Sequence, residues 1–484
     1  MRNFLNTLTL VLTGLLCVGI ARAQEPEQPA EPNKPKPAAR AMPPISEPDK
    51  PNDYNGVTDT NTRWQPDTTP LTGLQTPTLG NPDLRHSYWV PGFQYGATGQ
   101  SNALTSNSTQ DWYVTNYLGF SLSLQKGWTN SQLVLNYSGG ATLTTQTGEN
   151  NSTYQQFGVG QNFQWRRWQL QWSDQFSYLP QTAFGFGGST SLGLPGVGGP
   201  LGPSGPSSGG TTVPSQSIYA ALGPRYSNSA VVQMTYQLSA RQSLTASGSY
   251  GLLHFTQSGN VDTDDSIGSF GYNYALTAKD TIGVVYRFTA YHYQGQAQAL
   301  GDHTVNIAYG RKIAQRLALQ LFAGPDYTTY RVPVGTSRSR TSGYFSADLK
   351  YNFQKAFLEL DYVHGLGGGS GVLTGSELDQ ITLSANRRLT RLWTVNGSFG
   401  FGDNRSLPGS NIGTTIPSTS FKSWYLGAGV SRPIGRNVNF SLSYNASVNE
   451  PNQSGCTGTN CNASTTQHTI SVFVQWHTRP FVIE

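Results

Sequence analysis

The chain has 484 residues, of which 12% are charged, about half of the roughly 25% found in soluble domains. It holds 55 glycines and 25 tyrosines, its formal net charge is +5, and its mean hydropathy is −0.40. This composition excludes a protein dominated by membrane helices, and the scattered basic residues give no support for nucleic-acid binding. It favours an all-β protein whose strands have two different faces.

Residues 1–23 are typical of a secretory signal peptide. Arg2 supplies a basic start, residues 8–20 form an apolar run, and Ala21-Arg22-Ala23 is a small-residue cleavage site. No later stretch approaches the ~18 continuous apolar residues that a membrane helix needs. We therefore expect export and removal of this segment.

Residues 24–83 form a proline-rich segment that holds 13 of the 28 prolines. A segment of this composition cannot build a packed core, so we predict a periplasmic linker. The alternatives are an arm that binds a periplasmic partner and an arm that enters the lumen of the following domain.

From residue 84 to residue 484, apolar and polar residues alternate in segments of about ten residues. Leu118, Phe120, Leu122 and Leu124, for example, are separated by Gly119, Ser121 and Ser123. A period of two predicts strands, each with one apolar and one polar face.

The connections between these segments also alternate in length. Short turns, such as those at residues 126–129, 165–168 and 277–280, alternate with longer loops rich in Gly, Ser and Asn. The longest loop covers residues 180–227, and we expect it either to fold into the lumen or to remain exposed. This rhythm predicts an up-and-down transmembrane barrel with the short turns on the periplasmic side.

Seventeen alternating segments begin at about residue 115 or later, and the first and last both run downward. An even, closed barrel then needs one more upward strand, which residues 87–96 supply, although Pro91 requires an end or edge position. We predict eighteen strands, with sixteen as the alternative.

The apolar faces could pack together in a soluble sandwich or face lipid in a membrane barrel. Because a sandwich of seventeen or more strands with such regular hairpins would be exceptional, we predict the barrel. Its aromatic residues near strand ends, such as Trp165, Trp168 and Trp476, would form interfacial girdles. Asp174 falls in phase with the lipid face, where a carboxylate is costly; a bulge, a short strand or a covering partner would relieve this cost.

These features resemble a Gram-negative, porin-like outer-membrane β-barrel. The resemblance covers about residues 84–484 and implies an outer-membrane location, with lipid and lipopolysaccharide as neighbours. Many such barrels end in an aromatic residue, whereas here Phe481 lies near the end of the chain rather than at it.

Five charged residues are predicted to line the pore: Arg287, Asp348, Lys350, Glu359 and Asp361. About a turn at residues 352–355, Asp348 is expected opposite Glu359, with Lys350 diagonal to Glu359. Such residues set solute preference or form a salt-bridged network that holds the wall. The other inward positions are uncharged and polar, which suits small polar solutes.

The sequence contains no phosphate-binding loop, zinc-protease motif or nucleophile elbow, so we expect no enzyme, no cofactor and no metal site. The seven histidines are dispersed. His254, His364 and His468 could reach the outer rim, with Asp265, Asp302 or Ser370 as neighbours. Cys456 and Cys461 are candidates for one disulfide that closes a loop.

The sequence therefore predicts a channel for passive or weakly selective diffusion of small polar solutes. The first alternative is a barrel of an envelope system such as exopolysaccharide export, with residues 24–83 contacting a periplasmic partner. The second alternative is a rim-catalytic outer-membrane enzyme. A TonB-dependent transporter is disfavoured because 60 proline-rich residues cannot form a plug domain and the predicted strand count is too low.

Overall fold

The computed structural model describes residues 71–72, 87–101, 112–145, 151–179, 224–256, 261–294, 299–314, 316–331, 337–353, 355–368, 375–407, 419–453 and 464–483. The signal peptide, most of residues 24–83, residues 180–223, Cys456 and Cys461 lie outside this part of the chain. Among the described residues, no helix is long and apolar enough to cross a membrane.

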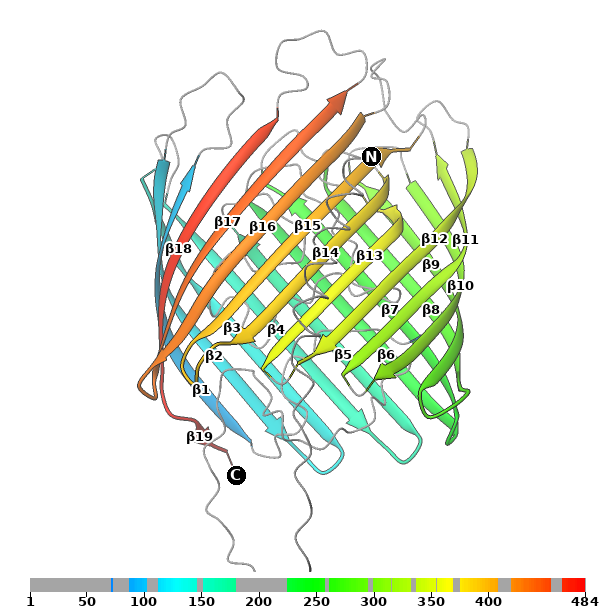
Figure 1. Cartoon of the computed structure of the whole chain (residues 1–484), viewed down its shortest axis with the longest axis horizontal. Helices are drawn as coiled ribbons and strands as arrows, with labels where there is room; N and C mark the ends of the chain where they lie inside the picture. Colours follow the sequence, from blue (N-terminus) through cyan, green and yellow to red (C-terminus); the bar gives the residue numbers. More distant parts are fainter. Residues whose placement is uncertain are drawn as a thin grey trace, which may run out of the picture. The chain divides into compact units, whose positions relative to one another are not determined.

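The described residues form one antiparallel sheet of eighteen long strands and one strand of two residues (Figure 1). The strands are β1 (Tyr88–Ser101), β2 (Trp112–Gly127), β3 (Ser131–Thr144), β4 (Ser152–Gln164), β5 (Trp168–Leu179), β6 (Arg225–Ser239), β7 (Gln242–Phe255), β8 (Thr263–Ala275), β9 (Asp280–Tyr293), β10 (Ala299–Ala314), β11 (Leu317–Arg331), β12 (Ser337–Asn352), β13 (Ala356–Gly367), β14 (Ser376–Arg388), β15 (Thr394–Ser406), β16 (Thr419–Ile434), β17 (Val438–Gln453), β18 (Thr465–His477) and β19 (Phe481–Val482).

The sheet closes into a barrel because β1 pairs with both β2 and β18. Every other long strand pairs with its neighbours in sequence, so the topology is up-and-down. Closure gives every long strand a hydrogen-bonded neighbour on each side, whereas a fully open edge in lipid would expose unsatisfied backbone groups. The prediction of eighteen strands is confirmed, and sixteen is wrong.

The first strand contains the proline that made its prediction uncertain. Pairing of β1 with β18 begins at Gly92, whereas pairing of β1 with β19 covers Tyr88 and Trp89. Pro91 lies between these two ladders, where Thr478 donates its backbone N–H to the Pro91 carbonyl at 3.0 Å. A missing N–H is tolerated at such an interruption.

Connections of two to five residues follow the even-numbered strands from β2 to β16, and connections of five residues or more follow the odd-numbered strands, which agrees with the predicted alternation. Hydrogen bonds close the turns: Trp165 N–H donates to Trp168 O at 2.8 Å, and Phe353 N–H donates to Ala356 O at 2.7 Å. Gly435, in the turn between β16 and β17, has a φ of 72°, a conformation that favours glycine.

The two faces of the wall separate as the alternation predicts. Large apolar side chains are exposed on the outside, including Leu118, Val284 and Ile307, whereas many polar side chains on the inside are buried. An apolar exterior and a polar interior are typical of transmembrane barrels. The structure is thus a transmembrane-type, up-and-down β-barrel, and the architectural resemblance to porin-like barrels is confirmed.

Asp174 remains on the outward face of β5. It pairs in register with Ala230 and Val159, and no bulge interrupts either ladder, so a bulge does not turn it inward. Instead, Asn228 on β6 donates a hydrogen bond from Nδ2 to Asp174 Oδ1 at 2.9 Å. This hydrogen bond satisfies one oxygen of the Asp174 carboxylate on the outer surface.

Candidate functional site: the inner wall of the barrel

The inner wall is a network of uncharged polar side chains over much of its circumference. Gln94 on β1 donates from Nε2 to Ser138 Oγ at 3.0 Å and to the Tyr154 hydroxyl at 2.6 Å, and all three side chains are buried. Similar cross-strand pairs join Ser177 with Ser227 and Tyr425 with Asn445. Hydrogen-bonded amides and hydroxyls give this part of the wall a polar, rigid surface.

Charged residues on the inner wall gather on one side. Apart from Arg225 and Arg388, at the ends of β6 and β14, the inward-facing acids and bases of the described strands lie on β8 to β13: Asp265, Arg287, Asp302, Lys312, Asp326, Arg338, Arg340, Asp348, Lys350, Glu359 and Asp361. The inner faces of β14 to β18 and of β1 to β5 carry uncharged residues at the corresponding positions. The lumen thus has a charged side and a neutral polar side.

The first charged group lies at the β12–β13 hairpin. Lys350 Nζ contacts Asp348 Oδ2 at 2.8 Å and Glu359 Oε1 at 3.0 Å, while Asp361 receives a hydrogen bond from Thr382 at 3.4 Å. One carboxylate oxygen of each acid lies within 4.8 Å of the others, a spacing that could hold a metal ion. The Lys350 ammonium already supplies a cation between two of these acids.

The predicted register of this hairpin is wrong by two residues. Lys350 lies opposite Glu359, and Asp348 lies opposite Asp361, because residues 353–356 form a four-residue turn closed by the Phe353–Ala356 bond. The cluster contains the residues that the sequence indicated, and the turn, which lies one residue later in the chain than predicted, changes which of them face each other.

The second charged group lies on β9 to β12. Arg287 donates to Thr304 Oγ1 at 3.4 Å, and its guanidinium carbon lies 4.8 Å from the centre of the Tyr344 ring. The Thr328 hydroxyl contacts Asp326 Oδ1 at 3.4 Å and Asp302 Oδ1 at 3.5 Å. One cation therefore faces two carboxylates across three strands.

Near the extracellular mouth, the pairing between β12 and β13 ends and the two strands separate. Their pairing ends at Phe345 and His364, although β12 continues to pair with β11 up to Ser337. Beyond this point, Arg340 on the inner face of β12 contacts Glu377 on the outer face of β14, at 3.0 Å. Opposite faces can meet only if the ends of β13 and β14 lie inside the upper part of β12.

Contacts on the far side of these ends support the same arrangement. Leu366 and Leu407 pack against Tyr291 and Tyr293 of β9, with Leu300 and Tyr330 in the same cluster. A Cβ added at Gly375 would lie 3.1 Å from Leu300 Cδ2, and one at Gly368 would overlap the Tyr291 ring. The ends of β13 to β15 therefore pack on the inner face of β9 to β11 and narrow the mouth.

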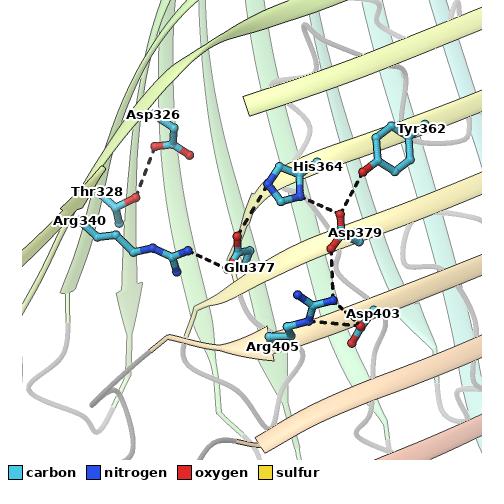
Figure 2. Close-up of polar contacts among 9 residues, drawn as sticks. All are labelled: Asp326, Thr328, Arg340, Tyr362, His364, Glu377, Asp379, Asp403 and Arg405. Atoms are coloured by element: carbon cyan, nitrogen blue, oxygen red, sulfur yellow. Dashed lines mark hydrogen bonds and ion pairs between the residues drawn. The ribbon is translucent and has the colours of Figure 1, made fainter. Parts of the chain in front are cut away.

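A chain of ion pairs, which we call the mouth network, runs along these strand ends (Figure 2). Its members are Arg340, Tyr362, His364, Glu377, Asp379, Asp403 and Arg405. His364 Nδ1 contacts Asp379 Oδ1 at 2.7 Å, the Tyr362 hydroxyl donates to the same oxygen at 3.1 Å, and Arg405 bonds Asp403 at 2.9 Å. The network joins four strands by charge-assisted contacts.

Of the three rim histidines considered from the sequence, His254 and His364 lie beside acids other than those expected, and His468 lies beside a tyrosine. His254 Nδ1 contacts Asp262 at 2.5 Å, His364 contacts Asp379, and His468 contacts the Tyr444 hydroxyl at 2.9 Å. In a hydrolytic triad, the second ring nitrogen would face a hydroxyl nucleophile. His364 Nε2 instead faces Glu377 Oε1 at 3.7 Å. Ser370 lies outside the described residues.

All five residues predicted to line the pore are on the inner wall, in two separate groups. Asp348, Lys350, Glu359 and Asp361 are brought together, whereas Arg287 belongs with Asp302 and Asp326. Sequence reasoning did not place Asp302 or Asp326 in the lumen. Asp302 and Thr304 are two residues apart on β10, as are Asp326 and Thr328 on β11, so each pair shares one face of its strand. This alternation is the signal that could have placed the two acids in the lumen.

Comparisons with known proteins give only remote structural similarity. No protein-family model matches the sequence, and no curated protein matches it. The structure is similar to OpdL of Pseudomonas aeruginosa (12% identity, 82% of this chain and 99% of that chain covered, TM-score 0.40). It is also similar to a BenF-like porin from Pseudomonas fluorescens Pf-5 (11% identity, 82% and 99% covered, TM-score 0.42). A third similar structure is that of P. aeruginosa OccK2 (OpdF) in complex with glucuronate (8% identity, 82% and 98% covered, TM-score 0.39).

Proposed function

We propose that the protein is an outer-membrane channel through which small polar solutes diffuse passively or with weak selectivity. The observation that carries this proposal is the closed barrel of eighteen strands with an apolar outside and a polar inside. The apolar outside suits contact with membrane lipid, and lipopolysaccharide would be its neighbour in the outer leaflet. Inward amides and hydroxyls can replace the hydration of a neutral polar solute.

The charged side of the lumen supports a role in solute preference. Arg287, Asp348, Lys350, Glu359 and Asp361 are proposed as residues that a passing solute meets, with Asp302 and Asp326 added from the geometry. Their mutual ion pairs also stabilise the wall, so both interpretations from the sequence apply to the same residues. The ion pairs hold the charged side chains in fixed places beside the lumen.

The test is ion conductance and solute flux of the purified, full-length barrel. We expect discrete conductance steps in planar bilayers, and swelling of loaded vesicles in small neutral sugars, with no swelling in a sugar too large for the lumen. Vesicles without protein and vesicles with heat-unfolded protein are the controls. A correctly folded barrel that gives neither conductance nor swelling would contradict the proposal.

A further inference from the structure

Leu71 and Thr72, from the proline-rich segment 24–83, lie against the inner wall of the barrel. The Thr72 backbone N–H donates to Asn273 Oδ1 at 2.9 Å, and Asn273 Nδ2 donates back to Thr72 Oγ1 at 2.7 Å. The Thr72 hydroxyl also shares a hydrogen bond of 2.7 Å with the Thr245 hydroxyl. Thr72 is 2% exposed, and its backbone N–H and its hydroxyl bond the wall.

Leu71 fills an apolar patch in a wall that is otherwise polar. It packs with Val285, Ala308, Phe322 and Tyr344, which come from four consecutive strands, β9 to β12. An apolar patch that faces a wet lumen costs free energy unless something covers it. The Leu71 side chain provides that cover and is 6% exposed.

Three glycines on neighbouring strands make room for the pair. A Cβ added at Gly283 would lie 2.7 Å from Thr72 Cγ2, one at Gly310 would lie 3.0 Å from Leu71 Cδ1, and one at Gly271 would overlap the Thr72 side chain. By contrast, a Cβ at Gly268, on the outward face of β8, would meet nothing within 4 Å. The backbone of β8 to β10 thus has the shape that the two residues require.

The position of the pair relative to β1 gives the contact a consequence for the pore. In the closed ring of strands, β8 to β10 lie on the side opposite β1, which begins at Tyr88. Thr72 and Tyr88 therefore lie on opposite walls, although only fifteen residues separate them along the chain. Docking therefore holds Leu71 and Thr72 on the inner wall opposite β1.

We propose that the inner wall of β7 to β12 is a binding site for a short peptide element, that Leu71 and Thr72 are its occupant, and that their docking restricts conductance. Recognition combines an apolar pocket for a leucine side chain with Asn273 and Thr245 as partners for a threonine. The conductance part of this inference rests on the proposed channel function, whereas the docking can be tested separately.

Docking is tested by a disulfide between Leu71→Cys and Gly310→Cys in the full chain, because the side chains at these positions adjoin in the structure. We expect the double variant to form an internal cross-link in the refolded barrel under mild oxidation, seen as a mobility shift that reductant reverses. Each single variant is the control for reaction with Cys456 or Cys461. A folded double variant that does not cross-link overturns the inference whatever the protein conducts.

Restriction of the pore is tested by single-channel recordings of two variants. Leu71→Asp changes the docked residue, and Gly310→Leu changes the wall that it contacts. Both should raise the mean conductance and shorten low-conductance dwell times by about tenfold, the effect of losing one buried leucine contact. Gly268→Leu, a substitution of equal size on the outward face, should change neither quantity. Oxidation of the double cysteine variant should lower its conductance, and reductant should restore it.

The outcomes separate the two proposals. If the wild-type barrel conducts but neither variant differs from it, the inferred restriction is wrong and the channel function stands. If the cross-link forms but no form of the barrel conducts, the channel function fails and the restriction fails with it.

Discussion

At the scale of single residues, Lys350 balances the charge of the lower inner wall. Its ammonium lies between Asp348 and Glu359, and Asp348 is 2% exposed. Removing one partner of such a group leaves a buried charge without compensation, which costs more than the pair itself contributes. The Lys350 side chain is 33% exposed, so water screens part of this effect.

We expect Lys350→Met to lower the free energy of unfolding by about 1–3 kcal/mol, the cost of leaving a buried acceptor unsatisfied. Urea unfolding of the barrel, refolded in lipid vesicles, would measure this free energy of unfolding. Lys422→Met, on the exposed outer face of β16, is the control and should have an effect within about 0.5 kcal/mol. Adding Asp348→Asn to Lys350→Met should recover part of the loss. Equal effects of the two lysine substitutions would contradict the assigned role.

At the scale of elements, each strand presents one face to lipid and the other to the lumen. Ile307 on β10 is 60% exposed on the outside, and Gln175 on β5 lies on the inner face of the wall. The same substitution should therefore have different costs at these two positions. The difference follows from the alternation of side chains along a strand.

We predict that Ile307→Arg destabilises the barrel by about 2–4 kcal/mol, the cost of an arginine near the middle of the bilayer. Gln175→Arg places the same side chain in the lumen and should cost less than about 1 kcal/mol. Unfolding of both variants from lipid vesicles measures the difference. Similar losses at the two sites would argue against a lipid-facing exterior.

At the scale of the whole molecule, the inner wall carries more negative than positive charge. On the described inner faces of β8 to β13, six carboxylates (Asp265, Asp302, Asp326, Asp348, Glu359, Asp361) accompany five cations (Arg287, Lys312, Arg338, Arg340, Lys350). Rings or patches of acids favour cations in a pore. The clustering on one side leaves the other side for neutral solutes.

The channel should therefore prefer cations weakly, which the zero-current potential in a KCl gradient would show. Glu359→Gln combined with Asp361→Asn should reduce that potential, because it removes two inward carboxylates. Glu450→Gln, on the exposed outer face of β17, should leave the potential unchanged. A preference for anions in the wild-type channel would contradict the charge distribution described above.

The sequence by itself determined the strand number, the up-and-down order and the face of nearly every side chain. These properties are local: a period of two sets the faces, and the length of each connection sets the direction of the next strand. The same periodicity placed Asp348, Lys350, Glu359 and Asp361 on one inner surface. It could not fix their pairing, because the position of the turn, at 353–356 instead of 352–355, sets the register.

Only the tertiary structure decided where β12 and β13 part, how the ends of β13 to β15 pack on β9 to β11, and where Leu71 and Thr72 bind. These contacts join residues that are far apart in sequence, such as Thr72 and Asn273, and no periodic pattern connects them. A leucine in a proline-rich segment carries no signal of its partner. Its place follows from the pocket that four neighbouring strands form once the barrel has closed.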